Sequence, residues 1–393
     1  VTVGDVLAVL APGQGSQKPG FLAPWLDLQG VTARLRWLST LAGVDLVHLG
    51  TEADAEEIKD TAKTQPLLVA AGLIAAEFLP MSDAQVLAGH SVGELTAAAL
   101  AGMLTPETAV TLAAVRGREM AAACALEPTG MSAVLGGDPE EVLAAIADNA
   151  LYPANRNGAG QIVAAGSLDG LARLKENPPA KAKVIPLQVA GAFHTPYMVT
   201  AETALEVVAT GVSTTDPAKL LLSNADGTAV TTGVEGIKRL VRQLTSPVRW
   251  DLCQDTMGEL GVTGIIELAP AGTLAGLAKR SLKGVEIVTV NTPDDLAAAR
   301  DLTNRHATHH WIDSSVQFHV AVAPAAGSFT PAEVNLGDSV AAGSVVGQVV
   351  TRQGAVDVVS AHTGVLVEWL ADADDPVAPG APLARLHPTG ADR

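Results

Sequence analysis

The chain has 393 residues, of which 48% are hydrophobic and only 3% aromatic, and its formal net charge is −17 at pH 7. This length predicts two or three domains. The acidic balance and the scarcity of aromatic rings argue against nucleic acid or an anionic membrane as the main partner. The two cysteines show no disulfide or metal-binding spacing, and no apolar run reaches the roughly 18 residues that span a bilayer. We therefore expect a cytoplasmic protein that binds neither nucleic acid nor a membrane.

The first predicted strand, residues 6–10, ends in a glycine-rich turn at residues 11–17. Such a turn can bring a backbone N–H close to a ligand. No lysine follows it in the spacing of a phosphate-binding loop, so a plain turn is the alternative. Farther along, Gln65-Pro66 is predicted to open an apolar helix over residues 67–78.

Ser91 stands where an apolar strand, residues 86–88, turns sharply into an alanine-rich helix. This pattern is typical of a nucleophile elbow. Gly89 and Gly93 lack a Cβ and so leave room for the helix to pass close behind the strand. The helix N-terminus would then direct N–H groups at an oxyanion formed beside Ser91. A serine hydroxyl also needs a base from elsewhere in the chain, and an ordinary turn with an N-cap serine is the alternative.

Two candidate partners of Ser91 follow in the chain. Residues 106–124 predict a helix that carries Arg116. An arginine on such a helix either lies at the surface or grips a carboxylate with its two-pronged guanidinium. His194 stands in a predicted loop. It is either the base that Ser91 needs or a solvated bystander.

Residues 130–187 predict the order βαββαβ, which is the ferredoxin-like order, inserted into a larger α/β domain. We expect the substrate in a cleft between this insertion and the core. Strands near residues 220 and 265 belong to the core again. A helix over residues 274–282 then ends in the densest cluster of cations available for an acidic partner, although a solvated helix end is the alternative: Lys279, Arg280 and Lys283.

Five motifs stand in a fixed order: Gly13-Gln14-Gly15-Ser16-Gln17, Gly89-His90-Ser91-Val92-Gly93-Glu94, Arg116-Gly117-Arg118, Ala192-Phe193-His194 and Arg242-Gln243-Leu244. Over residues 5–300 they resemble the malonyl-CoA:acyl carrier protein transacylases of bacterial type II fatty acid synthesis. The resemblance implies an α/β-hydrolase-like core over residues 1–129 and 188–303. It also implies transfer of a malonyl group from malonyl-CoA to the phosphopantetheine thiol of acyl carrier protein, with no metal or bound cofactor.

The same resemblance implies a Ser-His dyad, in which Ser91 attacks the thioester carbonyl and His194 takes its proton. A main-chain carbonyl, that of Gln243, would orient the histidine. The backbone N–H groups of Gln14 and Val92 would hold the oxyanion. A serine hydrolase such as a thioesterase, with water as the acceptor, is the alternative activity.

The resemblance also assigns the substrate contacts. Arg116 would bind the free carboxylate of the malonyl group, and Phe193 would mark a preference for malonyl over methylmalonyl. Acyl carrier proteins are acidic, so Lys279, Arg280 and Lys283 are candidates for docking them. One departure is Ala269-Pro270-Ala271-Gly272, where the family commonly has Gly-Pro-Gly.

Beyond residue 302 the composition changes, and an internal repeat with a constant offset of 37 residues relates Pro324, Gly327 and Gly343 to Ala361, Gly364 and Gly380. Residues 321–393, after a linker at 304–320, resemble the flattened β barrel of biotinyl/lipoyl carrier domains. The modified lysine of those domains falls at Gln353, and no lysine follows Lys283. We therefore predict a non-carrying relative that serves packing, oligomerisation, contact with other fatty acid synthesis enzymes, or scaffolding of a larger complex.

The predicted linker contains His306, His309 and His310. They could bind a metal, but no cysteine or carboxylate pattern accompanies them, so we predict no metal site.

Overall fold

The computed structural model describes residues 5–306 and 319–388. The chain divides into two compact units, residues 1–309 and 310–393, which are described separately. The first unit is a mixed α/β structure around a five-stranded sheet of order β7-β2-β1-β8-β9, in which every pairing is parallel. Its strands are β1 (Val6–Ala11), β2 (Val86–Gly89), β7 (Leu220–Leu222), β8 (Val262–Glu267) and β9 (Glu286–Thr289).

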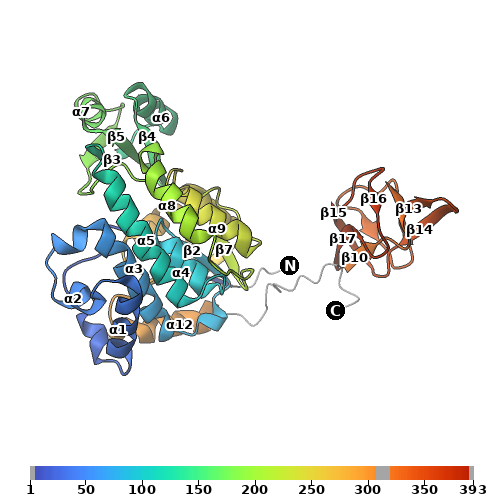
Figure 1. Cartoon of the computed structure of the whole chain (residues 1–393), viewed down its shortest axis with the longest axis horizontal. Coiled ribbons are helices and arrows are strands. Elements are labelled where there is room, and N and C mark those ends of the chain that lie inside the picture. Colours follow the sequence, from blue (N-terminus) through green and yellow to red (C-terminus); the bar gives the residue numbers. More distant parts are fainter. Residues whose placement is uncertain (1–4, 307–318, 389–393) are drawn as a thin grey trace. The chain divides into compact units, whose positions relative to one another are not determined.

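Helices cover both faces of this sheet (Figure 1), which explains why its strands are apolar throughout. Leu7 and Val9 pack on one face with α3 (Thr61–Glu77), α4 (Gly93–Leu100) and α5 (Pro106–Cys124). Val6, Ala8 and Leu10 point to the other face, where they pack with α10 (Trp250–Glu259) and α11 (Thr273–Ser281). Further helices of this unit are α1 (Val31–Ala42), α2 (Leu46–Thr51), α8 (Val199–Ala209), α9 (Gly233–Arg242) and α12 (Leu296–His306).

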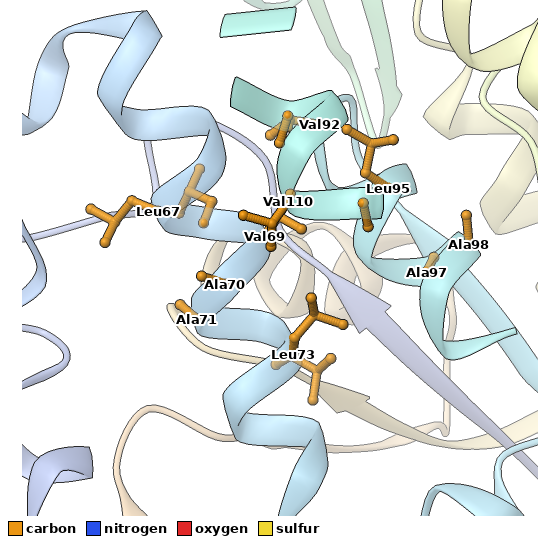
Figure 2. Packing of buried hydrophobic residues seen from close by; sticks show 14 of the residues in the cluster. Leu67, Val69, Ala70, Ala71, Leu73, Val92, Leu95, Ala97, Ala98 and Val110 are labelled. Atoms are coloured by element: carbon orange, nitrogen blue, oxygen red, sulfur yellow. The ribbon is translucent and has the colours of Figure 1, made fainter. Parts of the chain in front are cut away.

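Helix α3 begins at Thr61, earlier than the start predicted at Gln65-Pro66, and Pro66 lies inside it. The reason is Asp60, whose side chain accepts the N–H of Ala62 and caps the helix six residues before the proline. Figure 2 shows the small and branched side chains of α3 packed against those of α4. Gly72 marks the close contact, because a Cβ there would lie 2.9 Å from Cγ2 of Thr96. Helix α5 has the predicted bounds.

The turn from β2 into α4 depends on its two glycines. A Cβ on Gly89 would lie 2.0 Å from the carbonyl carbon of Gly93, and a Cβ on Gly93 would lie 2.2 Å from the carbonyl oxygen of Ala11. Both distances are far below any van der Waals contact, so no larger residue fits without moving the helix away from the sheet. The space predicted from the sequence is therefore confirmed. Ser91, at the apex, has a left-handed backbone with φ of 54°.

The insertion forms its own antiparallel sheet of order β4-β5-β3-β6 with two helices, in the βαββαβ order predicted from the sequence (Figure 1). Its elements are β3 (Thr129–Gly136), α6 (Pro139–Asp148), β4 (Tyr152–Gly158), β5 (Gln161–Ser167), α7 (Leu168–Glu176) and β6 (Ala182–Pro186). Strand β4 is tied to the core through Val248, which donates its N–H to Ala154 (2.9 Å) and accepts that of Arg156 (2.8 Å).

The second unit contains two four-stranded sheets, of order β10-β17-β15-β12 and β14-β13-β11-β16. The strands are β10 (His319–Val322), β11 (Gly327–Pro331), β12 (Ser339–Val340), β13 (Val345–Thr351), β14 (Gly354–Val359), β15 (Gly364–Trp369), β16 (Pro376–Val377) and β17 (Pro382–Pro388). The 37-residue offset carries β12 onto β16, β13 onto β17 and the start of β11 onto that of β15. It therefore exchanges the two sheets, and the internal repeat is structural.

The two halves also repeat their local contacts. The carboxylate of Asp338 accepts the N–H of Asn335 at 2.8 Å, and that of Asp375 accepts the N–H of Asp372 at 2.9 Å. The residue before each aspartate has a left-handed backbone, with φ of 94° at Gly337 and 70° at Asp374. The repeated turn therefore needs this conformation even where no glycine is present.

The predicted linker starts too early. Residues 304–306 belong to α12, and His306 is only 8% exposed. Its Nδ1 lies 2.9 Å from Oγ1 of Thr263, and its ring covers Gly264 of β8. Packing of this last helical turn on the sheet therefore overrides the polar composition that suggested a linker. His309 and His310 lie outside the described residues.

We predict that Gly89→Ala lowers the free energy of unfolding of the first unit by about 3 kcal/mol or more, because the new methyl group overlaps the backbone of α4. Gly276→Ala is the control. Gly276 lies in α11 with open space around its Cβ position, so an alanine there should stabilise the helix by up to about 1 kcal/mol. Chemical denaturation measures both, and similar values for the two variants would contradict the argument.

Candidate functional site

Ser91 and His194 meet at the carboxyl edge of the central sheet, although 103 positions separate them in the chain. Ser91 follows β2, and His194 stands in the segment that returns from the insertion. Their side chains are hydrogen-bonded, with 2.8 Å between Oγ and Nε2. His194, like Ser91, has a left-handed backbone, with φ of 59°. The structure therefore brings the predicted nucleophile and base together.

The main-chain carbonyl of Gln243 sets the tautomer of the histidine. Its oxygen lies 2.8 Å from Nδ1 of His194, and a carbonyl only accepts. Nδ1 therefore carries the proton, which leaves the lone pair of Nε2 to accept the hydroxyl hydrogen of Ser91. This is the arrangement that a general base needs.

The surroundings keep His194 neutral. Burial lowers its pKa to about 3, the charge of Arg116 acts in the same direction, and the bond to Gln243 opposes them. The ring is thus deprotonated and available as a base far below the ordinary histidine range.

Arg116 is not a surface residue, because it is only 2% exposed. Its Nη1 donates to Oε1 of Gln65 at 2.7 Å, and its Nη2 donates to Oε1 of Gln243 at 2.9 Å. Nη2 also lies 3.3 Å from Oγ of Ser91. Burial lowers the pKa of the guanidinium to about 10, opposed by the charge of Glu94, so the cation persists at neutral pH. A buried positive charge therefore points at the nucleophile.

Asn224, just beyond β7, holds the strained turn in place. Its Oδ1 accepts the N–H of Ser91 at 2.8 Å, and its Nδ2 donates to the carbonyl of Gly89 at 2.8 Å. A left-handed backbone at a residue other than glycine costs on the order of 1–3 kcal/mol. The two bonds span the apex and offset part of this strain.

Glu94, on the first turn of α4, is a second buried charge at the site. Burial raises the pKa of its carboxyl to about 8, while the N–H of Asn224 and the charge of Arg116 act in the opposite direction. Its two oxygens face two donors, the backbone N–H of Asn224 (2.6 Å) and Nε2 of Gln243. Because a donor faces each oxygen, a carboxyl proton would have no acceptor, so the geometry favours the carboxylate even though burial raises its pKa.

The two predicted oxyanion donors lie on either side of the elbow. Val92 immediately precedes α4, and Gln14 follows β1. Gly13, next to Gln14, lies so close to the elbow that a Cβ there would be 2.6 Å from the carbonyl oxygen of His90. Within residues 5–306 and 319–388, neither N–H is hydrogen-bonded to a protein acceptor. Both are therefore free to bind another group.

A cavity beside Ser91 lies between helices of the core. Its polar lining is Ser91, Arg116 and Gln243, and the rest is apolar: Leu95, Leu112, Leu205, Ile237, Leu240 and Val241. These residues lie on or next to α4, α5, α8 and α9, so this small cavity is within the core. The substrate cleft between insertion and core stays a prediction. The insertion reaches the site elsewhere, through Asn157 of β4, whose Oδ1 is 3.0 Å from Nε2 of His90.

Some predicted residues lie apart from this cavity. Phe193 is buried in the large hydrophobic cluster and is not part of the cavity lining. Lys279, Arg280 and Lys283 are exposed at and just beyond the end of α11, a helix that contacts β4 of the insertion. The structure therefore brings the chemical groups together but leaves the basic cluster at the surface.

Three polar residues of the site were missed as functional candidates: Gln65, Glu94 and Asn224. In the sequence, Gln65 marks only a predicted helix start, and Glu94 stands only as part of a motif. Asn224 does follow a core strand, and polar residues after parallel strands meet at one edge of a sheet. That signal could have placed Asn224 at the site.

Within the described residues, no cluster of three or more histidine, cysteine or acidic side chains is placed to hold a metal ion. Nor does any helix found there combine the length and apolarity required to cross a membrane.

The chain is similar to proteins of known family. A family model described as an acyl transferase domain matches residues 10–323. A malonyl CoA-acyl carrier protein transacylase of Mycobacterium tuberculosis is 53% identical over 296 residues, which cover 74% of this chain and 98% of the relative. The corresponding protein of Escherichia coli is 30% identical over 305 residues, covering 75% and 99%. The chain belongs to this acyl transferase family, among the malonyl CoA-acyl carrier protein transacylases.

Solved structures agree with this assignment. The crystal structure of MCAT from Mycobacterium tuberculosis has a TM-score of 0.73 and 53% identity, covering 75% of this chain and 99% of that one. A type II polyketide synthase acyl carrier protein in complex with its malonyl-transacylase provides another match, with a TM-score of 0.71, 30% identity and coverage of 75% and 99%. The family match ends at residue 323, so most of the second unit lies outside it.

The low pKa of His194 predicts a flat pH profile. The unprotonated ring is the active form, and a depressed pKa extends its range toward acid. We expect the second-order rate at which a fluorophosphonate reagent labels Ser91 to show no inflection near the ordinary histidine pKa of about 6.5. Intact mass after timed exposure between pH 5 and 8 measures this rate, with Ser91→Ala as the blank. A rate that falls through an inflection near pH 6.5 would contradict the prediction.

Proposed function

We propose that this protein transfers a malonyl group from malonyl-CoA to the phosphopantetheine thiol of an acyl carrier protein through a malonyl ester on Ser91. The observation that carries the proposal is the buried cation of Arg116, 3.3 Å from the nucleophilic oxygen. It matches a substrate with a free carboxylate next to the reacting carbonyl. The names of the relatives support the same substrate and acceptor.

The reaction has two symmetrical halves. His194 accepts the proton of Ser91 as Oγ attacks the thioester carbonyl, and the N–H groups of Gln14 and Val92 bind the developing oxyanion. The intermediate collapses with cleavage of the C–S bond, and the imidazolium of His194 returns the proton to the CoA thiolate. The carrier thiol then gives its proton to His194 and attacks the malonyl ester. The C–O bond to Ser91 breaks, and His194 returns the proton to Oγ, which restores the free serine.

Arg116 supplies the acyl specificity. Its partners Gln65 and Gln243 each accept one of its five N–H donors, which leaves others for the malonyl carboxylate. An acetyl group would leave these donors and the buried charge without a partner, and that costs binding free energy. Phe193, buried in the core, would restrict larger acyl groups indirectly, by limiting how far the neighbouring His194 can move.

A thioesterase is the competing reading, since the same dyad can activate water. The buried cation of Arg116 favours transfer of a carboxylated acyl group, and the base is oriented by a main-chain carbonyl and not by a triad carboxylate. Lys279, Arg280 and Lys283 are exposed and available to dock an acidic carrier protein. The chain as a whole repels such a partner, so a local basic cluster would guide it.

In finer detail, we propose an α/β-hydrolase-like core over residues 1–129 and 188–303, with a ferredoxin-like insertion at 130–187. For the second unit we propose a biotinyl/lipoyl-like barrel without a prosthetic group. Gln353 lies in the two-residue turn between β13 and β14, where such domains carry their lysine. The unit would then serve assembly, through contacts with other fatty acid synthesis enzymes.

We also propose a cytoplasmic location for the protein.

The first experiment is an intact-mass spectrum after brief exposure to malonyl-CoA. We expect a malonyl-sized gain on the wild type and none on Ser91→Ala, because the ester forms on that oxygen. The untreated spectrum should equal the mass of the bare sequence, since Gln353 offers no amine for biotin or lipoate. Release of free CoA without any gain in mass would favour the thioesterase instead.

Arg116→Ala should reduce the kcat/KM of malonyl loading about 100-fold, the value of a charge-assisted hydrogen-bonded pair of about 3 kcal/mol. Acetyl loading should change little or rise. Arg118→Ala is the matched control, because Arg118 lies on the same helix but is exposed. Loading rates from malonyl-CoA and acetyl-CoA test the prediction, and an unchanged preference in Arg116→Ala would remove the carboxylate contact from the mechanism.

A further inference from the structure

Gln243 contacts both His194 and Arg116. Its main-chain carbonyl accepts from Nδ1 of His194, and the Oε1 of its side chain accepts from Nη2 of Arg116 at 2.9 Å. An amide can be rotated by 180° with little change in shape. In the rotated form, the NH₂ group would face the guanidinium, and two donors would meet. Something must therefore hold the oxygen toward Arg116.

Two acceptors hold this amide from the other side. Nε2 of Gln243 donates to Oδ1 of Asn224 at 3.1 Å and to the carboxylate of Glu94. All three side chains are buried, with exposed fractions of 4% for Gln243, 0% for Asn224 and 4% for Glu94. Water cannot replace a lost partner easily in such a place.

Of the two acceptors, Glu94 is the decisive one. The Oδ1 of Asn224 is shared with the N–H of Ser91 at 2.8 Å. Glu94 instead offers one whole oxygen to Gln243, while its other oxygen accepts the backbone N–H of Asn224. The carboxylate also supplies the negative charge that balances Arg116 through the intervening amide. A chain of hydrogen bonds thus runs from the carboxylate of Glu94 through the amide of Gln243 and the guanidinium of Arg116 to the hydroxyl of Ser91.

We propose that Glu94 is a positioning residue for malonyl selectivity. It fixes the amide of Gln243 and thereby aims the guanidinium of Arg116 at the acyl group on Ser91. Glu94 itself does not touch the substrate. This inference rests on the proposed function, because it assumes that Arg116 binds the malonyl carboxylate.

The test compares two buried glutamates. Glu94→Gln places an NH₂ group where one of two donors now binds, so it must lose the hydrogen bond either to the N–H of Asn224 or to Nε2 of Gln243. Glu267→Gln makes the same change at the end of β8, where the carboxylate of Glu267 is completely buried and accepts the N–H groups of Gly272, Leu274 and Ala275. Glu267 does not line the cavity beside Ser91. Both variants perturb a buried acceptor, and only one perturbs the Arg116 system.

Intact-protein mass spectra of reactions quenched at set times give the malonyl and acetyl loading rates of each variant. We expect Glu94→Gln to lower the ratio of malonyl to acetyl loading about tenfold or more, as for loss of one buried charge-assisted bond. Glu267→Gln should leave this ratio unchanged. In the background of Arg116→Ala, Glu94→Gln should have no further effect on the ratio, because it acts through that arginine.

Other outcomes separate the hypotheses. If the wild type does not load malonyl, the proposed function fails. If it loads malonyl selectively and Glu94→Gln keeps the full ratio, or lowers both rates equally, only the positioning role fails. Should circular dichroism show that Glu94→Gln is unfolded, Gln243→Leu removes the same amide but retains the carbonyl that orients His194. The proposal then requires lost selectivity with acetyl loading retained, and retained selectivity overturns it.

Discussion

The buried guanidinium of Arg116 is the constraint around which the site is arranged. A cation removed from water must find hydrogen-bond acceptors and a counter-charge. Gln65 and Gln243 supply the acceptors, and Glu94 supplies the charge. The same cation helps to hold His194 neutral. In the proposed reaction it would also bind the acyl group, so selectivity and activation of the nucleophile would share one electrostatic source.

The reacting groups are also held by backbone strain that the fold compensates. Ser91 and His194 both have left-handed backbones, a conformation that disfavours residues with a Cβ. At Ser91, the side chain of Asn224 bonds to both sides of the apex, and the contact of Gly89 with Gly93 leaves no alternative path for the chain. The backbone of Ser91 is therefore held in one conformation, and its Oγ stays within reach of His194. The proposed dyad requires this, because a single hydrogen bond joins its two members.

The strands, the elbow and the repeat could be predicted from the sequence because each depends on residues close together in the chain or on a fixed offset. Apolar runs predicted four of the five central strands, all except β9, and the glycines around Ser91 predicted the elbow. The offset of 37 residues predicted two equivalent halves, and in the structure this offset exchanges the two sheets. Local composition failed where packing intervened. Helix α3 starts before Pro66 because Asp60 caps it, and His306 is helical because it packs against β8.

The sequence by itself thus determined most of the elements and, through ordered motifs, the family, the expected nucleophile and the expected dyad. Only the tertiary structure decided how the buried charges are compensated, since Glu94, Asn224 and Gln243 come from three separate elements. Their hydrogen bonds join residues up to 149 positions apart. No local pattern encodes such a contact, because it arises only when the folded chain brings α4, the segment after β7 and the end of α9 together.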